Sequence, residues 1–131
     1  MSNSVLKDKD NNVLNPKIPR YEKRLRKVLW TNPNPNNEMG ANVLINLSSN
    51  DYDELEWIFA YSTSNSNNTS VINLKGNGIL FSIVSYTDGV SLRRIIDRVS
   101  DTQYKTQIAK RATGDSSEHC IPIQVIGIKN S

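Results

Sequence analysis

Residues 29–61 read LWTNPNPNNEMGANVLINLSSNDYDELEWIFAY and contain both tryptophans of the chain. Within this stretch, apolar residues recur at alternate positions from 41 to 47 and again from 55 to 61. A period of two is typical of a strand with one buried face. The second run carries Leu55, Trp57, Phe59 and Tyr61, and we therefore expect it to form the centre of the core.

The segment between the two runs is acidic and reads SSNDYDE over residues 48–54. It offers several N-cap residues, and its carboxylates favour a single helical turn because acids stabilise a helix N-terminus. A calcium site built from the same acids is an alternative. The spacing lacks the glycine and the terminal glutamate of an EF-hand loop, so the pattern favours a structural corner.

Further strands are predicted outward from this stretch by apolar alternation and by turn signals. The expected ranges are residues 25–30, 71–75, 79–86, 90–100, 102–108 and 121–128. The tripeptide Gly76-Asn77-Gly78 predicts a tight turn that pairs 71–75 with 79–86 in a hairpin, and Thr87-Asp88-Gly89 adds a third strand to a meander. Residues 90–100 also fit helical spacing, but the turn before them favours a strand. Pro122 suits a strand start or an edge.

The polar segments at residues 31–37 and 111–118 are expected to be loops, and the polar segment at 62–68 is expected to be a loop or the tip of a hairpin. The chain has 131 residues, few alanines and many Asn and Ser, a composition that disfavours a helical bundle. About eight short strands separated by turns predict an all-β fold, an antiparallel two-sheet sandwich of the jelly-roll kind. We expect residues 25–131 to form this single domain and residues 1–24 to form an extended basic leader.

Charge and cysteine content limit the possible functions. The net charge is +3, and residues 1–27 hold eight of the sixteen Lys and Arg against three acids. A basic leader can neutralise phosphates, but no DNA-reading or RNA-reading pattern accompanies it, so a connector is favoured over nucleic-acid binding. The single Cys120 forms no intramolecular disulfide, and no apolar run is long enough to cross a bilayer. We expect a soluble protein.

Catalytic and metal-binding patterns are weak. His119 is the only histidine and stands between Glu118 and Cys120, whereas a metal site requires three or four converging ligands. A Ser-His-Asp arrangement stays open among the many serines, but no nucleophile-elbow sequence supports it. Four acids within residues 51–56 are a weak signal for glycoside hydrolysis. We expect a protein that is not an enzyme and that has no metal and no cofactor.

The adjacent pair Arg93-Arg94 lies in a predicted strand, so the two side chains are expected on opposite faces. One of them is expected to be buried in an ion pair and the other to be exposed.

Three segments, taken together, resemble a known protein family. The leader LKDKDNNVLNPKIPRYEKR resembles the segment by which tail-fibre and baseplate appendage proteins of tailed bacteriophages leave their stalk. The stretch VLWTNPNPNNEMGANVLINLSSNDYDELEWIF resembles the opening of the C-terminal head domain of those proteins, and CIPIQVIGIK resembles its closing strand. In that resemblance Trp30, Pro33, Pro35, Tyr52 and Trp57 correspond to structural signature positions.

The resemblance implies a receptor-binding head in the virion of a phage or prophage, synthesised in the cytoplasm of a bacterial host. It implies a homotrimer that contacts other phage structural proteins and recognises a host surface glycan or protein, without a membrane partner. A purely structural virion component, in the baseplate or as a head decoration, is the alternative. Binding residues are expected on loops of the sandwich. The candidates are Asn65, Asn67, Asn68, Tyr86 and Asp88, with a further loop at residues 113–118.

Overall fold

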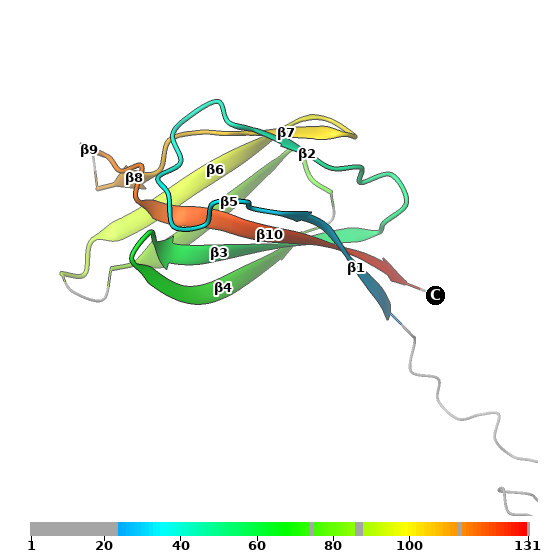
Figure 1. Cartoon of the computed structure of the whole chain (residues 1–131), viewed down its shortest axis with the longest axis horizontal. Coiled ribbons are helices and arrows are strands. Elements are labelled where there is room, and N and C mark those ends of the chain that lie inside the picture. Colours follow the sequence, from blue (N-terminus) through cyan, green and yellow to red (C-terminus); the bar gives the residue numbers. More distant parts are fainter. Residues whose placement is uncertain (1–23, 74, 86–87, 113, 131) are drawn as a thin grey trace, which may run out of the picture.

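The computed structural model of the chain describes residues 24–73, 75–85, 88–112 and 114–130. In this part the protein consists of two antiparallel sheets packed against each other, which confirms the expected all-β sandwich (Figure 1). The ten strands are β1 (Arg24–Thr31), β2 (Leu44–Asn46), β3 (Glu54–Ser62), β4 (Asn65–Asn73), β5 (Gly78–Val84), β6 (Ser91–Ser100), β7 (Gln103–Thr106), β8 (Lys110–Arg111), β9 (Gly114–Asp115) and β10 (His119–Asn130). Residues 1–23 of the predicted leader lie outside the described residues, and its last residue, Arg24, is the first residue of β1.

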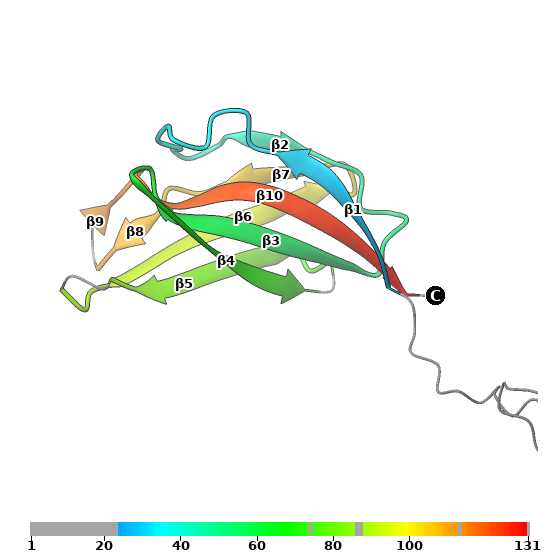
Figure 2. The same ribbon diagram turned by 60° about the horizontal axis from the view of Figure 1, so that its bottom comes forward.

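Each sheet has a long central strand. The first sheet has the order β1-β10-β3-β4, and in the second sheet β6 is flanked by β5 on one side and by β7 and β8 on the other. Strand β2 pairs with β7, and the short β9 pairs with β8. Strands β4 and β5 therefore form the edges of the two sheets on the same side of the sandwich, as Figure 2 shows along its lower border.

The core lies between the sheets and is centred on β3, as the sequence predicts. Leu55, Trp57, Phe59 and Tyr61 are all buried. Phe59 stacks on Phe81 of the opposite sheet with ring centroids 4.4 Å apart. Burial of these aromatic rings is a major source of folding free energy because each removes a large apolar area from water.

The run from 41 to 47 forms a shorter strand than expected. Only Leu44–Asn46 has strand structure, although Ile45 and Leu47 are buried and Leu44 is exposed, as the alternation predicts. The helical turn predicted at residues 48–54 is wrong. The segment forms a β-turn in which the Tyr52 amide donates to the Ser49 carbonyl at 3.2 Å.

The predicted pairing of 71–75 with 79–86 is also wrong. Strand β4 pairs with β3 and strand β5 pairs with β6, so the connection between β4 and β5 passes from one sheet to the other. Asn77 and Gly78 do not adopt the positive φ angles of a type I′ turn; Lys75 does, at 51°. The β5–β6 hairpin and the strand at β6 are confirmed, and Gly89 has a φ of 73° in its turn.

The segment 62–68 contains the tip of the β3–β4 hairpin, which confirms one of its two predicted forms. Only residues 63 and 64 form the turn, and β4 begins at Asn65. The segment 111–118 includes β9 and the end of β8. Pro122 lies within β10, a central strand, where a register shift between Pro122 and Gln124 marks a bulge. A bulge tolerates proline because the ladder is locally interrupted there.

Arg94 is fully buried between the sheets, while Arg93 is exposed, so the prediction of opposite faces is confirmed. The expected ion pair is not what holds it, because its guanidinium donates to backbone carbonyls. The acceptors are Cys120 (2.7 Å), Gln107 (2.8 Å), Met39 (2.8 Å), His119 (3.1 Å) and Gly40 (3.4 Å). Burial lowers the pKa of Arg94 to about 10, which leaves it protonated at neutral pH. One side chain thus connects β6, the start of β10 and two loops.

Candidate functional site

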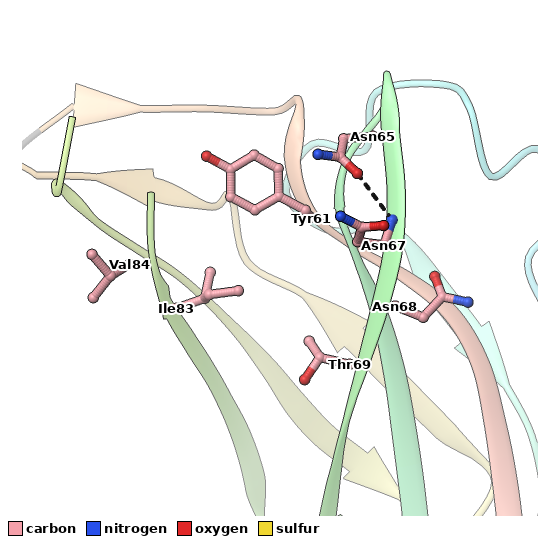
Figure 3. A pocket seen from close by; sticks show the side chains of 7 residues that line it. All are labelled: Tyr61, Asn65, Asn67, Asn68, Thr69, Ile83 and Val84. Carbon is pink, nitrogen blue, oxygen red and sulfur yellow. Dashed lines mark hydrogen bonds between the residues drawn. The ribbon is translucent and has the colours of Figure 1, made fainter. Parts of the chain in front are cut away.

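A pocket of about 180 Å³ lies on the open side of the sandwich, between β4 and the C-terminal end of β5 (Figure 3). Three of the predicted binding residues line it, all from the first half of β4. The lining residues are Tyr61, Asn65, Asn67, Asn68, Thr69, Ile83 and Val84. The structure therefore brings together the asparagines that the sequence singled out, but it places them on an edge strand and not on a loop.

The three asparagines differ in direction. Figure 3 shows the side chains of Asn65 and Asn67 on the side of β4 that faces Tyr61, and the side chain of Asn68 turned away. The strand pairing agrees, because Asn68 lies opposite Ala60 while the next residue, Thr69, lies opposite the core residue Phe59. Alternate residues of a strand point to opposite faces. Asn68 therefore borders the pocket without directing its amide into it.

Local hydrogen bonds hold this end of β4 in place. The backbone N–H of Asn65 donates to Ser62 Oγ at 3.1 Å, and the backbone N–H of Asn67 donates to Asn65 Oδ1, also at 3.1 Å. Tyr61 Oη donates to Ser85 Oγ at 3.0 Å, which ties the end of β3 to the residue after β5. These hydrogen bonds fix the backbone at the start of β4, the Asn65 carboxamide oxygen and the Tyr61 hydroxyl, so this part of the pocket wall is preorganised.

The pocket combines amides with apolar groups and has no charged side chain in its lining. Asn65 and Asn67 supply amide donors and acceptors, while Ile83 and Val84 form an aliphatic wall. Such a lining suits a neutral ligand that has both hydroxyl or amide groups and apolar patches.

The remaining predicted site residues do not line this pocket. Asp88 forms an ion pair with Arg111 and accepts a hydrogen bond from the Val90 amide at 3.1 Å. That backbone hydrogen bond is the main cause of a lowered pKa at Asp88, and Arg111 contributes to it. Tyr86 lies outside the described residues. The predicted loop at 113–118 contacts the β3–β4 turn, since the Thr63 amide donates to the Glu118 carbonyl at 2.9 Å.

His119 lies beside Tyr61, with the two rings edge to face and their centroids 5.5 Å apart. Its Nδ1 is 2.6 Å from Ser116 Oγ, a contact within a single turn of chain. Burial is the main cause of a lowered pKa at His119, and Arg111 adds to it. The neighbouring Cys120 is buried, and burial raises the pKa of its thiol to about 11, which disfavours the reactive thiolate.

A second hollow, of about 310 Å³, lies beside β1 and was not predicted from the sequence. Trp30, residues 32–34, residues 37–39, Val43 and Leu44 line it. Glu38 accepts a hydrogen bond from Ser117 Oγ at 2.5 Å there, and the buried Asn32 donates to the Pro122 carbonyl at 2.9 Å. The sequence signal that could have indicated it is the Asn and Pro cluster directly after a tryptophan.

In the part of the chain that the structure describes, no three His, Cys, Asp or Glu side chains gather closely enough to hold a metal ion. No helix with the length and apolar character of a membrane span occurs among these residues. Comparison with family models, with curated proteins and with solved structures gives no match. The resemblance to phage appendage heads therefore stays a prediction from the sequence.

Proposed function

We propose that this protein is a non-enzymatic head domain of a phage or prophage tail appendage that recognises a receptor on the host cell surface, with a glycan as the receptor. The observation that carries the proposal is the pocket beside β4. In this pocket Asn65 and Asn67 face Tyr61, and Ile83 and Val84 supply an aliphatic wall. The three sequence segments that resemble such heads support the same function. Neither argument requires a metal or a cofactor.

The chemistry of the pocket supports a glycan more than an ionic ligand. A sugar ring presents hydroxyl groups at its rim and C–H groups on its faces. Amides bind hydroxyl groups through paired donor and acceptor atoms, and aliphatic side chains pack against C–H groups. The lining of Asn65, Asn67, Ile83 and Val84 supplies both kinds of group and no charge.

A purely structural virion role is the second candidate, and one feature of β1 favours it. Leu25 and Val28 are 60% and 49% exposed on a strand that also carries Arg24, Arg26 and Lys27. Exposed apolar side chains among basic residues are typical of a surface that contacts another protein. In both candidates the partners are other phage structural proteins, and the resemblance implies a homotrimer in a virion appendage.

The direct test is binding of fluorescently labelled protein to a panel of bacterial strains. We expect binding to a subset of strains, loss of binding after periodate oxidation of surface glycans, and retention after protease treatment. Binding that protease abolishes and periodate spares would replace the glycan by a protein receptor. Failure to bind any strain, in a broad panel, would favour the structural virion role.

A further inference from the structure

The edge strands of the two sheets differ in how well they are protected from pairing with another strand. An edge strand presents unpaired N–H and C=O groups, and proteins commonly protect it by shortness, proline or charge. Strand β2 has three residues. Strand β1 carries Arg24, Arg26 and Lys27 within eight residues. These two edges both carry one of the usual protections.

Strands β4 and β5 have neither protection. β4 has nine residues with the sequence NSNNTSVIN, and β5 has seven with the sequence GILFSIV. Neither contains a charged residue or a proline, in a chain of which 22% is charged. Among the described residues no strand pairs with the outer edge of β4. Ile72, Leu80 and Val84 on these two strands are at least half exposed.

We propose that the β4 edge is a contact surface for a second copy of this chain, in which two β4 strands pair antiparallel across a two-fold axis. An isologous contact places the same surface opposite itself. A neutral strand tolerates this, whereas pairing two β1 strands would place Lys27 and the ion pairs Arg24–Glu54 and Arg26–Glu56 beside their own copies. Pairing would join two four-stranded sheets into one continuous sheet.

The contact is centred on the C-terminal half of β4, at residues 70–73. This half contains Val71 and Ile72, whose β-branched side chains favour strand pairing. Ile72 is seven residues from Asn65, or roughly 23 Å along an extended strand. The pocket lining reaches Thr69, next to this contact, so it is the Asn65 and Asn67 end of the pocket that stays accessible. The inference depends only on the sheet edges and not on the ligand of the pocket, and the two-fold dimer that it proposes differs from the homotrimer that the resemblance implies.

The experiment measures molar mass by light scattering after size exclusion over a range of protein concentrations. We expect a mass that rises from the 14.8 kDa of one chain toward twice that value. Ile72→Lys should hold the protein at the mass of one chain, because it places two lysines at the two-fold contact. The matched control is Val99→Lys, since Val99 and Ile72 are both 53% exposed and Val99 lies outside β4. The control should dimerise as the natural chain does.

Hydrogen exchange supplies a second readout that does not depend on any variant. Amides of β4 should gain protection as the protein concentration rises, and those of β1 should not. A mass of one chain at every concentration would overturn the proposal. A mass of three chains, or a dimer that Ile72→Lys leaves intact, would overturn it as well.

Discussion

At the scale of single residues, Arg94 shows how one side chain can join distant segments. Its guanidinium satisfies five carbonyls from three segments that are far apart in sequence: the loop at 39–40, the loop at 107 and the start of β10. A buried carbonyl that loses its partner costs about 1–3 kcal/mol. The planar five-donor geometry of arginine, and not its charge alone, fits this site.

We predict that Arg94→Lys lowers the free energy of unfolding by at least about 2 kcal/mol, because an ammonium cannot reach all five acceptors. Urea unfolding followed by tryptophan fluorescence measures it. Arg93→Lys, on the exposed face of the same strand, is the control and should change stability by less than about 0.5 kcal/mol. Equal effects of the two substitutions would contradict the assigned role of Arg94.

Gly127 is required by close packing. A Cβ atom at this position would lie 2.7 Å from the ring of Tyr52 and 2.9 Å from Leu29. We predict that Gly127→Ala destabilises the protein by about 1–3 kcal/mol, since the ring must move out of its site. Gly40→Ala is the control, because a Cβ there meets no atom within 4 Å. The midpoints of thermal unfolding of the two variants are compared. An equal loss in both would show a general effect of replacing glycine by alanine and not the contact with Tyr52 and Leu29.

We predict that the stability of the folded protein depends on pH because of His119. Its pKa is lowered from 6.5 by burial and by Arg111, while Glu118 and Asp88 act in the opposite direction. The unfolded chain therefore binds a proton more readily, so the stability due to neutral His119 is complete above pH 6.5 and declines as pH falls below it. Comparing urea unfolding of the natural chain and His119→Gln at about pH 8 and about pH 5 isolates this effect. A loss of the same size in both proteins would exclude His119 as its source.

At the scale of elements, the turn between β5 and β6 fixes the register of that hairpin. The Ser85 amide donates to the Val90 carbonyl at 2.8 Å, and Gly89 has a positive φ of 73° with open space around it. Any effect of a side chain at Gly89 must therefore come from backbone strain and not from a clash.

We predict that Gly89→Ala costs about 1 kcal/mol of stability. Gly114→Ala should cost less, because Gly114 has no positive φ and an added Cβ would make only an ordinary contact at 3.9 Å. If the two variants unfolded at the same denaturant concentration, the left-handed conformation at Gly89 would not be the cause.

The elements also show where sequence reasoning succeeds. The period of two placed Leu55, Trp57, Phe59 and Tyr61 in the core, because burial on one face of a strand leaves a direct trace in the sequence. The same periodicity could not predict the partner of β4. A strand followed by a connection to the other sheet has the same alternation as a strand followed by a hairpin turn. The Asn77-Gly78 signal was misleading since these residues adopt ordinary backbone angles.

Only part of the candidate site could be predicted, because the sequence does not show which strands pair. The sequence predicts Asn65, Asn67 and Asn68 as binding residues because they are polar. Which of them face the pocket follows only from the pairing of β4 with β3. Ile83 and Val84 read as ordinary strand residues, and their position across the pocket follows from the packing of the two sheets. Arg94 carried no signal of its acceptors, because these are backbone atoms.

At the scale of the whole molecule, the two open sides of the sandwich have different characters. The side at β1 is basic and is bordered by the hollow that contains Trp30. The side at β4 and β5 is uncharged, with an amide-lined pocket at one end of β4 and an exposed isoleucine at the other. In the proposals above, the β4 side thus serves both ligand recognition, at its Asn65 end, and self-association, at its Ile72 end.

In the proposed function, the pocket beside β4 binds the host receptor. Titration of labelled protein onto cells of the strain that binds best, with the natural chain, Asn67→Ala and Asn68→Ala, tests this binding site. Removing the Asn67 amide, which faces the pocket, should weaken binding about tenfold, a loss of about 1.4 kcal/mol. Removing the Asn68 amide, which points away, should leave binding unchanged. Equal binding by all three proteins would contradict the claim.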